Sequence, residues 1–442
     1  MKSSLNEIIL EISKGVLSPV ELTDKILTRI DRFDSTLKSC LGRNLKVVEE
    51  EKRFENQRLK RKSRLKGIPV SIKDLIDTAG IVTTYGSHLY SNHIPKRDAR
   101  VVTNLKNNGG VVLCKTNTHE FGLGIETPPT KNPWDLSRIP GGSSGGSAAA
   151  LAADLAVFAL GTDTGGSIRI PASMCGITGL KPTFGALPVD GIFPEAFSLD
   201  HVGPMCRYAS DLPLLLEAMG YPRRIERVEK RFIVGLVRTF FDQADLGVRS
   251  NVQKFIDKCV SEGFIEEVKE VTFPDLDLIN HSHSIIDTTE IAYTHRRQFK
   301  KSKDDYLSTS VEQIEEGMRV KATDYVGALR LRDKLTAKFS KVFKNVDVII
   351  TPTLPVVAPT ISEVKRMTLK DHYPYVKFLE AFNYLGFPAI TVPSGFCNGL
   401  PVGTQLVSRP WGENIIISLA SKYQGVTDWH THVPANYGEL KI

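Results

Sequence analysis

Apolar positions in the first sixty residues recur with the spacing of helices rather than strands. Residues 18–21 read Ser-Pro-Val-Glu, which combines a capping box with proline at the first helical position. Ile26, Leu27 and Ile30 then follow at helical spacing. The pattern predicts an N-terminal helical hairpin over about residues 3–62.

Beyond this hairpin, short apolar runs of strand length alternate with longer segments that are long enough to be crossover helices. The predicted strands are 69–72, 111–113, 155–160, 232–237, 346–350, 389–392 and 402–407. The predicted helices in the second half of the chain are 249–262, 311–342 and 412–424. Because strands and helices alternate, the sequence predicts an α/β fold in which helices cover both faces of a sheet.

The polar segment 220–232 is the strongest candidate for a domain boundary, but predicted strands continue on both sides of it. The sequence has no internal repeat and no low-complexity linker. We therefore expect one continuous domain over residues 1–442. In this domain the hairpin precedes a core at about 67–215, and a helical insertion with the final strands of the sheet occupies about 232–442.

Composition places few limits on function. The 442 residues, of which 41% are hydrophobic, are enough for a large buried core. A net charge of +7 is mild for this length and neither requires nor excludes an anionic partner such as RNA. The densest basic run, Lys52–Lys66, includes Glu55 and has helical spacing, which favours a solvated helix face over a nucleic-acid contact.

The cysteine pattern and the N-terminus indicate an intracellular location. Six cysteines are scattered without a CxxC pair, which is typical of a protein in a reducing cytoplasm. The first ten residues contain Glu7 where a secretory signal needs an apolar core, and no apolar run approaches the roughly 20 residues that span a bilayer. We predict a cytoplasmic protein with no membrane partner, and the sequence leaves a homodimer open.

The most informative segment runs from Pro140 to Thr183 and places two Gly/Ser loops on either side of an Ala-rich helix and a strand. Glycines gathered in this way let backbone N–H groups come close to a bound atom. Serine hydroxyls beside such amides indicate a nucleophile with an anion-binding site.

Other interpretations of these loops fit less well. A phosphate-binding P-loop needs a lysine after its glycines, and none follows either cluster. A dinucleotide fingerprint and the nucleophile elbow both need a strand leading into the loop. Gly141–Gly145 and Gly142–Gly146 match the GxSxG pattern of the elbow, but Pro140 and the polar residues before it do not form a strand. A turn without chemistry explains one such cluster better than two clusters around the same helix and strand.

Residues Gly141–Thr183, including the closing GLKPT, resemble the signature segment of the amidase signature family. GIPVSIKD at 67–74 is similar to the lysine strand of that family. Further landmarks of the family resemble TNTHEFGLG at 116–124, NPW at 132–134, TPTLPVVAPTI at 351–361 and NYLGFPAITVPSG at 383–395. The resemblance covers most of the chain and is weakest over 220–345. It implies a single domain with a large mixed central sheet covered by helices.

The resemblance also implies which residues carry out catalysis. Ser167 of the TGGS loop is the expected nucleophile, Ser143 is the expected relay, and Lys73 of the IKD strand is the expected base. The two serines are 24 residues apart, in agreement with the family pattern. The expected oxyanion donors are the backbone amides of Thr164, Gly165, Gly166 and Ser167.

Acyl transfer requires residues of these types. A serine hydroxyl is a poor nucleophile until a base takes its proton, and neither loop contains a histidine. A lysine can serve when it is neutral, and burial lowers a lysine pKa from its usual value of about 10.4. Lys73 follows the apolar Val70 and Ile72, which favours its desolvation. Ser143 would then pass the proton of Ser167 to Lys73 and return it to the leaving amine.

Several nearby polar residues are assigned structural roles. Arg169 is expected to brace the nucleophile loop rather than to anchor an anionic substrate, and Asp163 is expected to accept hydrogen bonds from loop amides. Ser144 is interpreted either as a turn residue or as a residue that forms a hydrogen bond within its loop. Cys175 is interpreted as a buried apolar residue rather than a second nucleophile. No cofactor is implied, and two histidine pairs lack further ligands at metal-binding spacing, namely His281 with His283 and His430 with His432.

Three functions stay open on the sequence alone. The favoured one is a stand-alone amidase that cleaves a small or medium carboxamide through an acyl-Ser167 intermediate. The second is the glutaminase (A) subunit of an Asp/Glu-tRNA amidotransferase, but residues 280–300 lack its glutamine-recognition pattern and the chain is somewhat short. The third is a catalytically silent binding protein, against which the intact Lys73, Ser143 and Ser167 argue. Residues 126–132 are shorter than the usual run in the family, which leaves the shape of the substrate open.

Overall fold

The computed structural model describes residues 3–56 and 63–440. Its N-terminal helices are α1 (Leu5–Lys14), α2 (Pro19–Leu37) and α3 (Val47–Asn56). The predicted capping box is confirmed, because Ser18 accepts the N–H of Glu21 while the Glu21 carboxylate accepts the N–H of Ser18. A short strand, β1 (Cys40–Arg43), lies between α2 and α3, where only helices were predicted. Residues 57–62, which include part of the basic run, lie outside the described residues.

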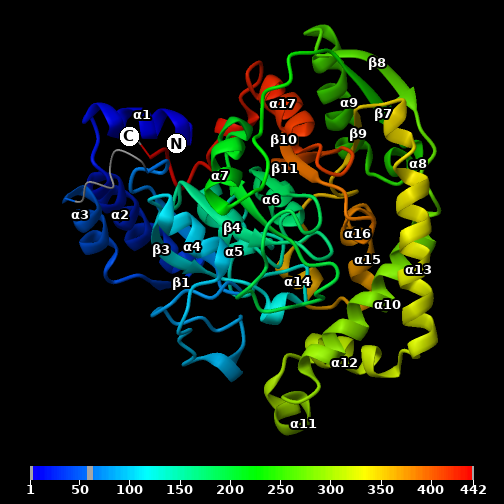
Figure 1. The fold of residues 1–442 in the computed structure, drawn as a ribbon, viewed down its shortest axis with the longest axis horizontal. Helices are drawn as coiled ribbons and strands as arrows, with labels where there is room; N and C mark the ends of the chain where they lie inside the picture. Colours follow the sequence, from blue (N-terminus) through cyan, green and yellow to red (C-terminus); the bar gives the residue numbers. More distant parts are fainter. Residues whose placement is uncertain (1–2, 57–62, 441–442) are drawn as a thin grey trace.

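The eleven strands of the described chain form one sheet (Figure 1), in the order β1-β3-β2-β4-β6-β5-β10-β11-β9-β7-β8. β2 pairs in parallel with β3 and β4, whereas β4 pairs antiparallel with β6, so the sheet is mixed as expected. The predicted α/β class is confirmed. After β1 the strands are β2 (Pro69–Lys73), β3 (Val111–Thr116), β4 (Phe158–Thr162), β5 (Thr178–Lys181), β6 (Val202–Cys206), β7 (Phe232–Leu236), β8 (Ile265–Glu270), β9 (Val348–Pro352), β10 (Ala389–Cys397) and β11 (Leu400–Val407).

The structure corrects several predicted elements. β6 was missed because Gly203 and Pro204 interrupt its apolar pattern. β8 was missed because it is a charged edge strand with mostly exposed residues. The helix predicted over 311–342 is two helices, since Val320 and Lys321 have extended backbone conformations. The helices on either side of this break are α12 (Ser308–Arg319) and α13 (Ala322–Phe339).

The helices that follow the two Gly/Ser loops are buried against the centre of the sheet. α5 (Gly145–Ala152) packs on β2, β3, β4 and β6, and α6 (Arg169–Cys175) packs on β5, β10 and β11. This packing fixes the start of each helix, and with it the loop that precedes it. The other helices are α4 (Arg100–Asn107), α7 (Leu212–Met219), α8 (Arg238–Asp242), α9 (Leu246–Ser261), α10 (Leu276–His295), α11 (Phe299–Ser302), α14 (Ile361–Val364), α15 (Tyr373–Val376), α16 (Glu380–Tyr384) and α17 (Glu413–Gln424).

A layer of helices from the second half of the chain lies at the right and lower right of Figure 1. In this layer α10 contacts α12, α13 and α16. An apolar cluster that includes Phe240, Phe339 and Phe382 holds the layer together and takes in Ile279 and Ile286 of α10. One face of α10 is therefore anchored in a core. No helix in the described ranges combines the length and apolar character needed to cross a bilayer.

Candidate active site

Lys73 is the last residue of β2, which lies between β3 and β4 in the sheet. Its side chain is fully buried, and its Nζ lies 2.7 Å from Ser143 Oγ and 2.7 Å from Thr162 Oγ1. Burial lowers the pKa of Lys73 to about 7, against the opposing attraction of nearby carboxylates, of which Glu195 has the largest effect. A large share of this amine is therefore uncharged at neutral pH.

Thr162, the last residue of β4, contacts Lys73 and was not among the predicted site residues. Its hydroxyl reaches Lys73 because β2 and β4 run in parallel and in register, with Ile72 opposite Leu160. Both side chains therefore stand at the same edge of the sheet. Only the pairing of the two strands reveals this contact, since Lys73 and Thr162 are far apart in the chain.

Replacing Thr162 by valine is expected to lower kcat/KM by about tenfold, because Lys73 loses one of two hydrogen-bond partners. The threonine oxygen accepts from the amine and so stabilises its charged form. Its loss should lower the pKa of Lys73 further and move the acid limb of the kcat/KM profile to lower pH. Thr162→Ser keeps the hydroxyl and should restore both properties. An acid limb that stays in place in Thr162→Val would show that the hydroxyl has no influence on the amine.

Ser143 lies in the first Gly/Ser loop and is joined to Gly142 by a cis peptide bond. The hydroxyl of Thr127 donates to the carbonyl oxygen of Ser143 at 3.2 Å. A Cβ at Gly142 would lie 2.3 Å from the carbonyl oxygen of Glu126, so only glycine fits there. The short segment before the NPW motif thus supports the loop that carries Ser143. In this part of the described chain, the residues that line the cavity next to Ser167 end at Ile125.

Ser144 connects the two Gly/Ser loops. Its N–H donates to the carbonyl oxygen of Ser167 at 3.1 Å, and its hydroxyl donates to the carbonyl oxygen of Thr162 at 3.2 Å. Ser144 therefore does more than form a turn, because its hydrogen bonds join the loop of Ser143 to the loop of Ser167 and to the end of β4.

Ser167 lies in the second loop, shortly before α6, and is 6% exposed. The loop is shaped by the carboxylate of Asp163, which accepts the N–H of Gly166 at 3.0 Å and of Ile168 at 3.2 Å. The predicted acceptor role of Asp163 is confirmed. The Gly166 amide, one of the expected oxyanion donors, is already engaged by this bond. Gly166 has a φ of 126°, and a Cβ there would lie 2.6 Å from Leu379 Cδ1.

Arg169 braces this loop, as predicted. Its fully buried guanidinium donates to both carboxylate oxygens of Asp163, at 2.9 and 2.8 Å, and to Gln405 Oε1 at 2.7 Å. Burial alone would raise the pKa of Asp163, but the pair with Arg169 holds this pKa well below its usual range. The guanidinium has no part in the described lining of the cavity, so it does not anchor a substrate there.

Replacing Arg169 by methionine is expected to lower the free energy of unfolding by about 3–5 kcal/mol, because the buried Asp163 loses its partner. The control is Arg238→Met, which removes an exposed ion pair to Glu270 and should cost under about 1 kcal/mol. Chemical denaturation of both variants tests the comparison. Equal costs for the two would show that Arg169 does not brace the loop.

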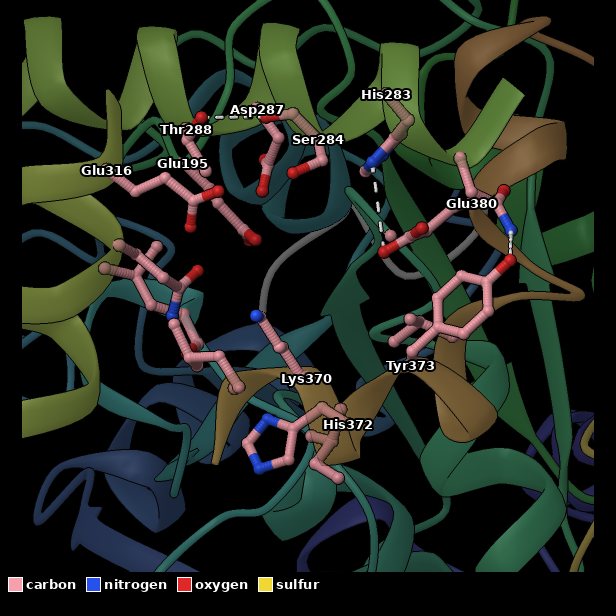
Figure 2. Close-up of a pocket in the computed structure, with 18 of the residues that line it drawn as sticks. Glu195, His283, Ser284, Asp287, Thr288, Glu316, Lys370, His372, Tyr373 and Glu380 are labelled. Atoms are coloured by element: carbon pink, nitrogen blue, oxygen red, sulfur yellow. Dashed lines mark hydrogen bonds and ion pairs between the residues drawn. The ribbon is translucent and has the colours of Figure 1, made fainter. Parts of the chain in front are cut away.

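A cavity of about 730 Å³ borders Ser167 and Gly165. Residues 122–125, α10, α12, α15, α16 and a short 3-10 turn, η7 (Leu369–His372), form its other walls (Figure 2). Its apolar lining includes Leu123, Ile125 and Val376. Its size suits a small molecule rather than a polymer.

Comparison with known proteins identifies the family. The model of the family described as Amidase matches residues 21–417. The chain is 36% identical to the A subunit of glutamyl-tRNA(Gln) amidotransferase from Thioalkalivibrio sulfidiphilus (strain HL-EbGR7), over 99% of each chain. The chain belongs to the amidase family. The resemblance seen in the signature segment is thereby confirmed, and the protein is an amide-cleaving enzyme by family.

Two solved structures extend this comparison. A crystal structure of an amidase superposes with a TM-score of 0.88 and 28% identity, covering 96% of this chain and 99% of the other. The A subunit of glutamyl-tRNA(Gln) amidotransferase from Thermotoga maritima superposes with a TM-score of 0.81 and 31% identity, covering 95% of this chain and 93% of the other. The sheet and its helical layers are therefore those of the amidase fold.

The cysteine and histidine residues considered in the sequence analysis have contacts that are typical of structural residues. Cys175 is buried, its Sγ donates to the carbonyl oxygen of Pro140 at 3.2 Å, and burial raises the pKa of its thiol, so the predicted apolar role is confirmed. His283 is buried with Nε2 3.1 Å from the carbonyl oxygen of Thr164, and His281 lines the cavity. His430 is buried and stacks edge-on against Tyr208, and the described residues include no cluster of three or more His, Cys, Asp or Glu arranged to hold a metal.

The sequence analysis did not predict the carboxylates that line the cavity of this amidase. Glu195, Asp287 and Glu380 line the cavity, and burial is the main cause that raises the pKa of each. His283 and Asp287 are four residues apart on α10 and therefore share one helix face. This spacing is the one signal in the sequence that could have placed Asp287 at a site.

Proposed function

We propose that this amidase hydrolyses the C–N bond of a small-molecule carboxamide, with Ser167 as nucleophile, Ser143 as relay and Lys73 as base. The observation that carries the proposal is the fully buried amine of Lys73, 2.7 Å from Ser143 Oγ, at the edge of the sheet where the two catalytic loops meet. Because the pKa of Lys73 is lowered to about 7, the amine can accept a proton at neutral pH.

The proposed first step relays two protons and forms one C–O bond. Ser167 Oγ attacks the amide carbon while its proton passes to Ser143 Oγ, whose own proton passes to Lys73 Nζ. The electron pair of the carbonyl bond moves to its oxygen and gives a tetrahedral oxyanion. When this intermediate collapses, the C–N bond breaks and the leaving nitrogen takes the proton back through Ser143. Water then attacks the acyl-Ser167 ester by the same route and releases the carboxylic acid.

The oxyanion is assigned to backbone amides of the second loop. Since Asp163 engages the Gly166 amide, the proposed donors are the amides of Thr164, Gly165 and Ser167. The hydroxyl of Thr164 donates to Asp200 at 2.6 Å. This bond holds the loop before Ser167, whereas Arg169 holds it after Ser167. A loop fixed in this way supplies donors that need no rearrangement as charge develops on the substrate.

A second candidate function is the A subunit of a glutamyl-tRNA amidotransferase, which the 36% identity to such a protein favours. It would bring partner subunits and tRNA, whereas the stand-alone amidase needs neither. Two observations support the stand-alone enzyme. The amidase structure has the higher TM-score, and the described lining of the cavity contains no arginine to pair with the α-carboxylate of glutamine.

Release of ammonia or amine by the purified chain from a panel of carboxamides tests the proposal. The panel should vary in acyl length and aromaticity and should include glutamine. Hydrolysis of simple amides without any partner supports the stand-alone enzyme. Ammonia release from glutamine that depends on added amidotransferase partners and glutamyl-tRNA would support the second function instead. Absence of hydrolysis in both arms would refute the proposed activity.

A further inference from the structure

Three carboxylates from distant parts of the chain face one another on one wall of the cavity (Figure 2). Glu195 belongs to the loop before β6, Asp287 belongs to α10, and Glu316 belongs to α12. We call these three residues the carboxylate cluster. The folded chain brings them together although 121 residues separate Glu195 from Glu316.

The carboxylate cluster contains oxygen atoms that the protein does not satisfy. Glu195 is 9% exposed, and within the described chain its Oε2 and Oδ1 of Asp287 are buried without a hydrogen-bond partner. Asp277 differs, although it lines the same cavity, because it accepts a hydrogen bond from the hydroxyl of Tyr373 at 2.6 Å. A buried carboxylate oxygen without a donor is costly, so a native protein retains it for a reason.

Electrostatic repulsion adds to this cost. Burial first, and then the charges of Asp287 and Asp200, raise the pKa of Glu195 well above its usual value. Burial first, and then Asp200, Glu290 and Glu316, raise the pKa of Asp287 to about 8. The surroundings thus hold protons on these two acids, and a bound positive charge would let them ionise and pair.

The charge of Lys73 lowers the pKa of Glu195, but it does not outweigh burial and the neighbouring carboxylates, and Lys73 has to be neutral to act as the proposed base. Lys370 points into the cavity from η7, but it is exposed, and in the described part of the chain no ion pair links it to the carboxylate cluster (Figure 2). Burial lowers the pKa of His283 to about 4, so this histidine is neutral. The missing cation must therefore arrive with the ligand.

The geometry points to an amide substrate that carries a positively charged amino group, held by Glu195, Asp287 and Glu316 while its amide reaches Ser167. This inference rests on the proposed function, since one cavity of about 730 Å³ borders both Ser167 and the carboxylate cluster. An organic ammonium fits better than a metal ion, because the described residues include no group of three such ligands arranged to hold a metal. A primary ammonium has three N–H donors, so it can donate one hydrogen bond to each of the three carboxylates.

The test compares three matched series of primary amides with acyl chains of three to six carbons. One series has a terminal amino group, one ends in a methyl group, and one ends in a carboxylate. The wild type is expected to hydrolyse the amino series with kcat/KM about 10- to 100-fold above the methyl series, the range expected for a hydrogen bond to a charged group. The carboxylate series should be the poorest. Equal kcat/KM for the amino and methyl series would overturn the inference and leave the proposed amidase activity intact.

Asp287→Asn and the matched control Asp277→Asn locate the effect. The preference for the amino series should fall to about onefold to threefold in Asp287→Asn and stay at the wild-type ratio in Asp277→Asn, because the Asp277 carboxylate already has a donor. The melting temperature of Asp287→Asn should be unchanged, since the variant replaces an acid that is already neutral in the ligand-free protein. A preference that survives in Asp287→Asn, or that Asp277→Asn abolishes equally, would refute this site.

Binding separates failure of this inference from failure of the proposed function. Calorimetry with Ser167→Ala should detect the amino series and not the methyl series, whether or not the wild type hydrolyses either one. The wild type can fail to hydrolyse any of these amides while Ser167→Ala still binds the amino series. In that case the proposed function is refuted and the cation site is supported. If Ser167→Ala binds neither series or both alike, the cation site is refuted. Added Mg²⁺ or Ca²⁺ that displaces the bound amide at equal concentration would indicate a metal site instead.

Discussion

Ser167→Ala is expected to lower the rate of amide hydrolysis by a factor on the order of 10⁴ or more, because no other hydroxyl can form the acyl intermediate. The fold should not change, since the side chain of Ser167 borders the cavity and its carbonyl still accepts the Ser144 amide. A fluorophosphonate probe gives a second readout, because it reacts covalently with an activated serine. Wild-type protein should be labelled and Ser167→Ala should not.

Ser284→Ala is the matched control for this experiment. Ser284 also lines the cavity, but it belongs to α10, whereas Ser167 belongs to the second loop. This variant should be labelled like the wild type. Equal labelling of wild type and Ser167→Ala would show that the nucleophile is another residue.

Lys73→Met is expected to reduce kcat/KM by about 10³-fold or more, because Ser143 then loses the amine that accepts its proton. Methionine fills similar space without burying an amine. In the wild type, kcat/KM should rise with pH and level off above about pH 7. The sign follows from the lowered pKa of Lys73, since the active neutral amine gains population as pH rises through about 7. Rate measurements between pH 5 and 9, with circular dichroism to check folding, test both statements.

Lys115→Met is the control for the loss of a buried lysine. Lys115 lies on β3, is fully buried, and burial lowers its pKa to about 8. Its amine lies 3.8 Å from the carboxylate of Asp74 rather than near the serines. Lys115→Met should therefore lose stability while its folded fraction keeps its turnover. Activity near the wild-type level in Lys73→Met would refute the assignment of the base.

The parts of the fold that could be predicted are those in which local pattern and tertiary structure agree. The strand that ends at Lys73 is buried along its whole length, and its apolar residues Val70 and Ile72 make it recognisable in the sequence. The strand at 202–206 could not be identified in this way, because Gly203 and Pro204 are unfavourable in isolation and are tolerated only by the pairing with β4 and β5.

The site likewise contains residues that the sequence identifies and residues that only the fold brings together. Lys73, Ser143 and Ser167 lie in motifs that a sequence can reveal, and the structure places the first two within hydrogen-bonding distance. Thr162 could not be predicted, because its contact depends on the register between two parallel strands. The carboxylate cluster could not be predicted either, since each member is an ordinary acidic residue until α10, α12 and the loop before β6 come together.

The position of Lys73 within the sheet has a consequence for how this enzyme can change over time. The proposed base lies on a strand that neighbouring strands fix on both sides, whereas most of the walls of the cavity come from helices outside the sheet. Substitutions in those helices can alter which molecule is accepted without moving the proton acceptor. New preferences can therefore arise by ordinary point mutation while the cleavage machinery is inherited unchanged.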